Sequence, residues 1–533
     1  MEGRARRGAA GPALALALAA SLVAACGGGH RKGDRAAGPS ALERQYPALR
    51  WVPADASWVA TCARARDCVT AARELGEVIS IPLGVAMGEV DQAFRSGLGA
   101  SPLSLEDVAA AGIDLDAGAA LFAAGGLPTA VMPVRDAAIL RQFLDRERPE
   151  RHAALIRHRG HDVYTWTDAR LAVSWVALDG WLLVHAGFPP AEGGDTGAGL
   201  DWLDQVLAAP GGAGLGDDPD LARAARRGGQ ALGGEAPGTL AMVRLDRLAR
   251  DIADWPGSPG EEVACLERAA AVAPRLSAAA EVSWDGASGW VALDLAPGAA
   301  AALRAHTAPP PPPGYLAYRR RAALSAAFAV ELPWLEEVRA ISGCPLLDEP
   351  IRDPVRAMTG MAGPRGWHLA ASDLDPDQLS GAGAVHLVLT DRALVTAQLE
   401  SIPGRSLFER SRRIAGREVK VLSLPGLPAI VYRQEGDRFT GSLGAEAMEV
   451  VLGPGDGGAA PPGLELAALA IEPPRLPHLG ELISAVLVRG LGWGWGGAGQ
   501  ALAGRLARYE RGALQVVLNG DSIEIHAGMR LRK

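Results

Sequence analysis

The sequence lacks the common signatures of enzyme chemistry. It contains no G-x-S-x-G nucleophile elbow, no H-E-x-x-H zinc helix and no cysteine–histidine family signature. Its five cysteines include no C-x-x-C pair, the spacing typical of structural zinc sites. We therefore predict no metal and no cofactor, and no catalytic residue can be named.

The sequence also has fewer basic than acidic residues. The chain has 53 Lys and Arg against 61 Asp and Glu, for a net charge of −8. A mildly acidic protein carries no electrostatic footprint for nucleic acid, so no nucleic-acid partner is expected. Lysine occurs only at positions 32, 420 and 533. With so much Ala and Gly, this arginine bias suggests a G+C-rich genome rather than a specialised arginine surface.

Long apolar runs are absent after residue 25, so no transmembrane helix is predicted there. Before it, the basic start at Arg4, Arg6 and Arg7 leads into an Ala/Leu-rich run, which is typical of a secretory signal peptide at 1–25. Val23-Ala24-Ala25-Cys26 resembles the lipobox of bacterial lipoproteins. That resemblance implies cleavage before Cys26 and acylation of this cysteine. The alternatives are an ordinary secretory peptide or an uncleaved anchor.

Lipid on Cys26 would attach the chain to a membrane, because two or three acyl chains anchor a protein stably. By resemblance to Gram-negative lipoproteins, Gly27 rather than Asp after the cysteine favours the outer membrane, with the protein facing the periplasm or the cell surface. Residues 26–44 are expected to form a flexible tether.

The four remaining cysteines are Cys62, Cys68, Cys265 and Cys344. An even number in an oxidising compartment suggests two disulfides, with three possible connectivities. Cys62 ends a strand-like run and Cys68 opens a helix-like one. A local Cys62–Cys68 bridge would leave Cys265 to pair with Cys344.

Two halves of the chain repeat one order of landmarks. A strand and an aspartate at 129–136 match 385–391, and Gly160-His161-Asp162-Val163 matches Gly416-Arg417-Glu418-Val419. Each half ends in a hairpin signature, with Asp285-Gly286 in one and Asn519-Gly520 in the other. Between them, Pro309 to Pro313 is typical of a stiff spacer.

The repeat predicts two tandem copies of a mixed α+β domain, with antiparallel sheets and helices packed on the sheet. The expected limits are 45–308 for the first copy, 309–314 for a proline-rich linker and 315–533 for the second copy.

Three motifs resemble ligand sites, and each has a simpler interpretation. Gly494-Trp495-Gly496-Gly497-Ala498-Gly499 matches G-x-G-x-x-G but lacks a βαβ unit, so no nucleotide is predicted. His152, His158 and His161 alternate with arginines, which favours a solvated basic turn over a metal site. Asp373, Asp375 and Asp377 begin like a calcium loop, but Gln378 and Ala384 replace the required Gly and Glu. Turn and cap roles explain these acids better.

Tryptophans fall at strand positions, where core packing explains them more simply than sugar binding. These are Trp166, Trp175, Trp181, Trp284 and Trp290.

The landmarks resemble a group of uncharacterised exported bacterial proteins with tandem α+β domains behind a signal peptide or lipobox. Leu49-Arg50-Trp51-Val52-Pro53-Ala54-Asp55 is similar to their entry into the first strand. The resemblance implies no activity and therefore no catalytic residues.

The leading hypothesis is a non-enzymatic envelope lipoprotein that binds a protein or another envelope component. Whether it has any catalytic activity stays open. The alternatives are a periplasmic hydrolase with a site assembled from scattered residues and a carrier of an apolar ligand. A polar cleft with convergent acids would favour the hydrolase, an apolar cavity the carrier, and a flat exposed apolar patch the binding module.

Overall fold

The computed structural model describes most of the chain from residue 40 onward. The described residues are 40–70, 73, 91–92, 95, 101–124, 127–151, 153–167, 172–187, 200–211, 214–234, 236–255, 260–283, 286–331, 364–375, 380–389, 396–397, 399–402, 405–425, 428–455, 463–476 and 507–532. They fall into two compact units, the first ending at Ala292 and the second beginning at Leu293.

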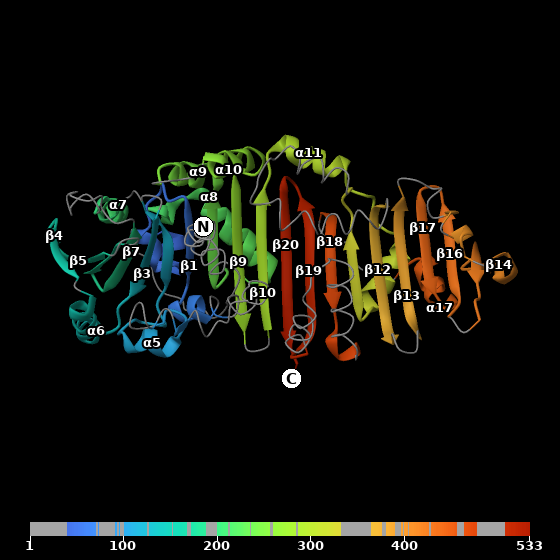
Figure 1. Cartoon of the computed structure of the whole chain (residues 1–533), viewed down its shortest axis with the longest axis horizontal. Coiled ribbons are helices and arrows are strands. Elements are labelled where there is room, and N and C mark those ends of the chain that lie inside the picture. Colours follow the sequence, from blue (N-terminus) through green and yellow to red (C-terminus); the bar gives the residue numbers. More distant parts are fainter. Residues whose placement is uncertain are drawn as a thin grey trace, which may run out of the picture. The chain divides into compact units, whose positions relative to one another are not determined.

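The first unit is built on one sheet with the strand order β10-β9-β8-β1-β2-β3-β7-β6-β5-β4, and the pairings from β9 to β4 are antiparallel (Figure 1). Its strands are β1 (Trp58–Cys62), β2 (Ala119–Ala124), β3 (Leu127–Pro133), β4 (Ala154–His158), β5 (His161–Thr167), β6 (Ala172–Leu178), β7 (Trp181–Gly187), β8 (Thr239–Arg244), β9 (Arg275–Ser283) and β10 (Gly286–Asp294). Its helices are α2 (Ala41–Gln45), η2 (Pro47–Trp51), α5 (Leu105–Ala110), α6 (Ala137–Arg151), α7 (Asp201–Ala208), η4 (Ala209–Gly211), η5 (Leu215–Asp217), α8 (Pro219–Leu232), α9 (Leu245–Ala253) and α10 (Gly260–Val272).

The second unit is also built on one sheet, with the antiparallel order β20-β19-β18-β11-β12-β13-β17-β16-β15-β14. Its strands are β11 (Leu324–Phe328), β12 (Pro364–Asp375), β13 (Ser380–Leu389), β14 (Glu409–Ile414), β15 (Arg417–Leu422), β16 (Ile430–Glu435), β17 (Arg438–Leu443), β18 (Leu464–Ile471), β19 (Tyr509–Asn519) and β20 (Ser522–Leu531). Its helices are α11 (Pro297–Ala305), α12 (Pro313–Arg321), α16 (Arg405–Phe408), α17 (Ala445–Leu452) and η6 (Pro473–Arg475).

The protein is therefore an α+β protein with antiparallel sheets and helices packed on them. The unit boundary after Ala292 lies before the predicted linker at 309–314, which the structure places inside the second unit. The reason is packing of α11: Leu303 shares a hydrophobic cluster with Leu466 and Leu518. Pro313 is the first residue of α12, a position where its missing N–H costs nothing.

Capping and turn residues determine where several helices and strands begin or end. The Asp218 side chain accepts hydrogen bonds from the backbone N–H groups of Asp220 and Leu221, and Pro219 is the first residue of α8. The β6–β7 hairpin turns at Asp179 and Gly180, with φ of 47° and 80°. Both were predicted from the sequence.

Helices cover both faces of the first sheet. On one face, Trp202, Leu203 and Leu221 of α7 and α8 pack against strand residues such as Phe122 and Leu183. On the other face, Val108 of α5 and Leu140 of α6 pack against strand residues that include Trp175. Trp175 and Trp290 are buried, as expected for core residues.

In the second unit, α12 and α17 pack on one face of the sheet; Figure 1 shows α17 behind its strands. Tyr315 of α12 and Met448 of α17 share a core there with Ala370, Ala384 and Val431. The two helices are themselves in close contact, because Gly314 lies against the backbone at the end of α17.

We predict that Gly314→Ala destabilises the protein by roughly 2 kcal/mol. A Cβ at Gly314 would lie 2.5–2.6 Å from the backbone oxygens of Val450, Val451 and Gly453, which cannot move without shifting α17. Urea-induced unfolding measures the effect. Gly298→Ala is a matched control, since Gly298 also follows the first proline of a helix but has nothing within 4 Å of its Cβ position. A Gly314→Ala protein as stable as the control would contradict this account.

Candidate binding surface

The face of the second sheet opposite α12 and α17 carries apolar side chains across six strands. Side chains of directly paired residues point to the same side of an antiparallel sheet. His368 contacts Tyr315 of α12, so its partner Ala327 faces the helices, and the neighbouring residues Ala326 and Phe328 face the other way.

Three registered rows make up this opposite face. The first row is Met529, Gly512, Ile471, Leu324 and Ala371; the second is Ala527, Leu514, Leu469, Ala326, Leu369 and Val385; the third is Ile525, Val516, Ala467, Phe328, Trp367 and Leu387. None of these side chains is charged. We call the three rows together the apolar face.

The middle row is the most accessible part of the apolar face. Leu369, Leu469 and Leu514 are 40%, 44% and 40% exposed. They lie on β12, β18 and β19, and Ala326 of β11 stands in register between Leu369 and Leu469. Three large apolar side chains aligned on one sheet form a patch, and patches of this kind mark interaction sites more often than scattered leucines do.

Other parts of the second unit pack only beside this row, as far as the described residues show. Leu295 and Leu303 pack in one cluster with Phe328 and Val516 of the third row. Leu399 and Ile402 contact the β13 side, at Val385 and Leu387.

Arginines collect at one end of the apolar face, where β11 begins and β20 ends. Six exposed arginines lie there: Arg321, Arg475, Arg508, Arg511, Arg530 and Arg532. Backbone pairing brings them together, since Arg511 pairs with Arg530 and the Arg532 N–H donates to the Arg508 carbonyl. Arg475 also donates to the Arg321 carbonyl at 2.9 Å. We call this group the arginine rim.

Four acids lie near the arginine rim among the described residues: Glu472, Glu510, and Asp373 and Asp375, which end β12 just beyond its pairing with the start of β11. Glu472 binds Arg475 at 3.0 Å and lies 3.9 Å from Arg511, and Glu510 lies 3.5 Å from Arg530. These are exposed pairs, which contribute little to stability and leave the guanidinium groups accessible to another anion.

The helix-covered face of the same sheet encloses a polar cluster. Arg319 of α12 and Glu465 of β18 form a two-pronged ion pair at 2.5 and 2.6 Å, and Gln515 donates to Glu465. Burial alone would raise the pKa of Glu465, but these donors outweigh it and hold that pKa below its usual value. Beside the pair, the rings of Tyr315, His368 and His386 lie 6.0–6.1 Å apart.

Both histidines of this cluster are 1% exposed. His386 shares a hydrogen bond of 2.9 Å with Thr440, while neither ring nitrogen of His368 has a hydrogen-bond partner among the described residues. Burial lowers the pKa of each histidine to about 4, and for His386 the neighbouring His368 adds to the effect. They are closed off from solvent, so they are core residues rather than a reaction site.

The first unit contains a similar pair. His185 of β7 and Thr129 of β3 lie opposite each other and share a hydrogen bond of 2.8 Å. The His185 ring stacks on Trp202 of α7 with centroids 4.7 Å apart. Burial lowers the pKa of His185 to about 3. This histidine is likewise enclosed in the core.

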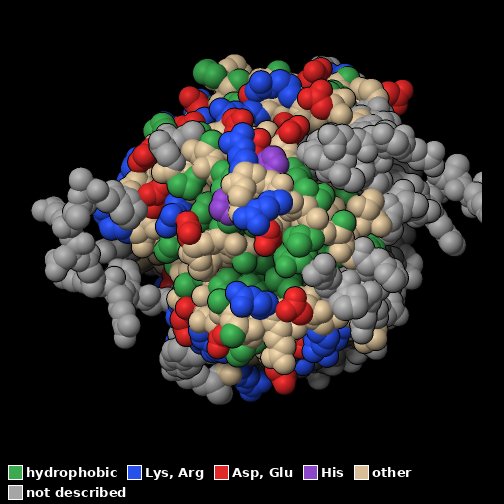
Figure 2. All heavy atoms as spheres, turned by 90° about the vertical axis from the view of Figure 1, so that its left-hand side faces the viewer, with side chains coloured by type: hydrophobic (Ala, Val, Ile, Leu, Met, Phe, Trp, Pro, Cys, Tyr) green, Lys and Arg blue, Asp and Glu red, His purple; other side chains and the backbone are tan. Residues whose placement is uncertain are grey.

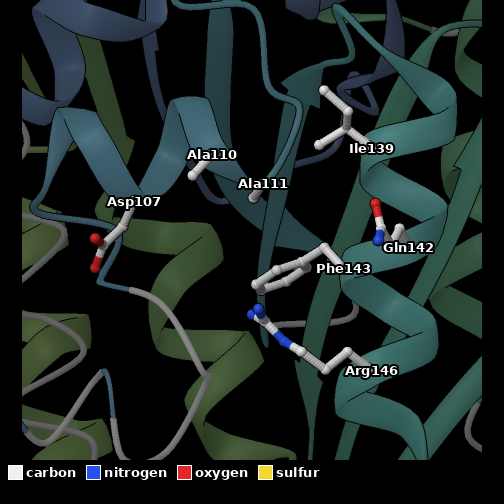
Figure 3. A pocket seen from close by; sticks show the side chains of 7 residues that line it. All are labelled: Asp107, Ala110, Ala111, Ile139, Gln142, Phe143 and Arg146. Carbon is white, nitrogen blue, oxygen red and sulfur yellow. The ribbon is translucent and has the colours of Figure 1, made fainter.

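A pocket of about 540 Å³ opens between α5 and α6 in the first unit (Figure 3). Ala110, Ala111, Ile139, Gln142 and Phe143 line it, with Asp107 and Arg146 at its borders. The Arg146 guanidinium lies 5.3 Å from the centre of the Phe143 ring. The described lining residues offer one carboxylate, Asp107, and one cation, Arg146.

The histidine-rich segment forms the β4–β5 hairpin of the first unit. The predicted solvated turn is there at Arg159 and Gly160, while His158 ends β4 and His161 begins β5. His158 contacts Asp204 of α7 at 2.6 Å, and this hydrogen bond lowers the pKa of the Asp204 carboxyl. Figure 2 views this end of the unit, where histidines lie among acidic and basic side chains. Such a charged border protects the edge strand from pairing with another chain.

A disulfide joins Cys62 and Cys68, whose Cα atoms are 5.9 Å apart. Cys265 is also disulfide-bonded. Its expected partner Cys344, the acylation site Cys26 and the glycine motif at 494–499 lie outside the described residues. Asp373 and Asp375 end β12, and Asp377 also lies outside.

Within the described residues, no three His, Cys, Asp or Glu side chains are grouped so that they could hold a metal ion. In that same part of the chain, no helix is both long enough and apolar enough to cross a membrane.

Comparisons with known proteins add little. No family model matches the chain, and no curated protein matches it. Two crystal structures of TP0453 are similar at low identity. Form I is 11% identical over 47% of this chain and 79% of that chain, and form III is 9% identical over 49% and 86%; both have a TM-score of 0.25. A TM-score of 0.25 does not establish a shared fold.

Proposed function

We propose that this chain is a membrane-anchored lipoprotein of the cell envelope that acts as a non-enzymatic binding module. The observation that carries the proposal is the apolar face, with Leu369, Leu469 and Leu514 exposed in one registered row. A flat exposed apolar patch is the feature that favours a binding module over a hydrolase or an enclosed carrier.

The proposal includes two tandem copies of one domain. The strand orders of the two units support it, because each strand from β1 to β10 has a counterpart ten numbers higher at the same place in the other sheet. The paired Thr129–His185 and His386–Thr440 rungs also support it: they join β3 to β7 and β13 to β17, with the two residue types exchanged.

The anchor of the proposed module is lipid on Cys26, which would attach the chain to the outer membrane. The sequence around Cys26 supports this part of the proposal. An anchored module meets its partner within the envelope, so even a modest affinity of the apolar face suffices.

We expect crosslinking in living cells, followed by purification and mass spectrometry, to recover one dominant envelope component. The double variant Leu469→Ser/Leu514→Ser should lose it, because both substitutions place hydroxyl groups in the middle of the apolar face. The control is Leu105→Ser/Leu155→Ser, which changes two leucines of the first unit that are 40% and 47% exposed.

Recovery of the same component with both double variants would refute a binding role for the apolar face. A Cys26→Ser version tests the anchor separately, since mass spectrometry should find no acyl chain at residue 26 of the purified protein.

A further inference from the structure

We infer that the apolar face, together with the arginine rim, docks onto an anionic lipid surface. The inference rests on the proposed function and names the partner of the same surface. The proposed partner is a lipid layer, which consists of acyl chains bordered by phosphate groups.

Shape and composition of the apolar face fit acyl chains. Its three rows contain no charged side chain and lie on one sheet. Acyl chains need no directional partners, whereas protein–protein interfaces normally contain polar groups that form hydrogen bonds. Interfacial proteins insert apolar residues only about 5–10 Å into the headgroup and acyl boundary. Leucine side chains on a sheet can reach that depth without any change of fold.

The position of the arginine rim fits the headgroups. Arg511 precedes Gly512 and Arg530 follows Met529, at one end of the first row. Because side chains alternate along a strand, both arginines point to the other side of the sheet. When the apolar face is inserted into the acyl layer, the end of the sheet that carries the arginine rim lies at the level of the lipid phosphates. Arginine suits this place because its apolar stem can follow the sheet while its guanidinium binds a phosphate with two hydrogen bonds.

Charge distribution also favours an anionic partner. The whole chain has a net charge of −8, yet six exposed arginines gather at this end, against four acids among the described residues: Glu472 and Glu510, which pair with arginines of the rim, and Asp373 and Asp375 at the end of β12. Basic groups beside an apolar surface are the combination by which proteins recognise anionic bilayers.

Vesicle sedimentation tests the inference. The protein is the chain from residue 26 onward with Cys26→Ser, so that neither the signal peptide nor the lipid contributes. We expect it to sediment with vesicles of phosphatidylethanolamine and phosphatidylglycerol, to bind phosphatidylcholine vesicles more weakly, and to lose affinity as salt is raised.

Two double variants separate the contributions. Leu469→Ser/Leu514→Ser should abolish binding to both kinds of vesicle. Arg511→Gln/Arg530→Gln should weaken binding to the anionic vesicles by about 30-fold, from roughly fivefold per arginine, and leave the phosphatidylcholine binding unchanged. Leu105→Ser/Leu155→Ser and Arg157→Gln/Arg250→Gln, which change exposed residues of the first unit, are the controls. Thermal unfolding checks that each variant is folded.

Absence of binding to anionic vesicles, or binding unaffected by the leucine and arginine variants, overturns the inference. If crosslinking then recovers a protein that Leu469→Ser/Leu514→Ser loses, the binding module stands and its partner is a protein. If neither vesicles nor a crosslinked component depends on the apolar face, the proposed function fails as well.

Discussion

Replacing Asp218 with alanine is expected to destabilise the first unit by about 3–5 kcal/mol, the cost of breaking a buried ion pair by removing one partner. One oxygen of Asp218 accepts the hydrogen bonds that cap α8, and the other binds the Arg244 guanidinium. The Arg244 side chain is 9% exposed, so its charge would be left buried, with the carbonyls of Ala54 and Ala56 as its remaining hydrogen-bond acceptors among the described residues.

Asp218→Asn separates the contribution of the ion pair from that of the helix cap. The amide oxygen can still cap α8, so the loss should reflect mainly the ion pair, while alanine loses the cap as well. The control is Asp246→Ala, whose carboxylate pairs with Arg250 on the surface and is 56% exposed; it should cost less than about 1 kcal/mol. Guanidinium-induced unfolding of the three variants measures the order. Equal stability of Asp218→Ala and Asp246→Ala would show that Arg244 finds another partner.

Elements with local signals could be predicted from the sequence. Asp218 before Pro219 predicts the start of α8, and Asp179-Gly180 predicts the turn between β6 and β7. Both features depend on the conformational preferences of adjacent residues. Strand pairing is different. β1 pairs with β2 and β8, so Ala60 lies beside both Leu121 and Ala241, and no local pattern encodes that choice.

The candidate surface could not be found from the sequence for the same reason. Leu369, Leu469 and Leu514 come from strands far apart in the chain, and each alone is an ordinary strand residue. Arginine abundance suggested only a genome bias, whereas the fold concentrates Arg321, Arg475 and four others at one end of the sheet. The Asn519-Gly520 turn between β19 and β20 was visible in the sequence, but the register of these strands with β18 and β11 decides which face is apolar.

His368 and His386 show a further limit of sequence reasoning. In the sequence they are isolated residues of two strands, yet the β12–β13 register places them directly opposite each other under Tyr315. Burial lowers the pKa of both imidazole rings, so the fold rather than the local sequence decides how they respond to acid.

Acidification is expected to destabilise the protein steeply between about pH 6.5 and pH 4. Burial lowers the pKa of His368 and His386 to about 4 and that of His185 to about 3, from 6.5 in the unfolded chain. The folded state therefore binds fewer protons than the unfolded state in this range. The stability that the neutral histidines contribute is fully present above pH 6.5 and is lost as the pH falls toward 4. At pH 5 each histidine should cost on the order of 2 kcal/mol.

Urea-induced unfolding between pH 7.5 and pH 4.5 measures this slope. His368→Leu should reduce the slope by the equivalent of nearly one proton. It should cost little at pH 7.5, since neither ring nitrogen of His368 has a hydrogen-bond partner in the described part of the chain. Val431→Ala serves as the control: it removes two methyl groups from the same core as Tyr315 and should lower stability equally at every pH. An unchanged slope in His368→Leu would mean that its imidazole takes up protons in the folded state, and that the cluster beneath α12 opens to solvent.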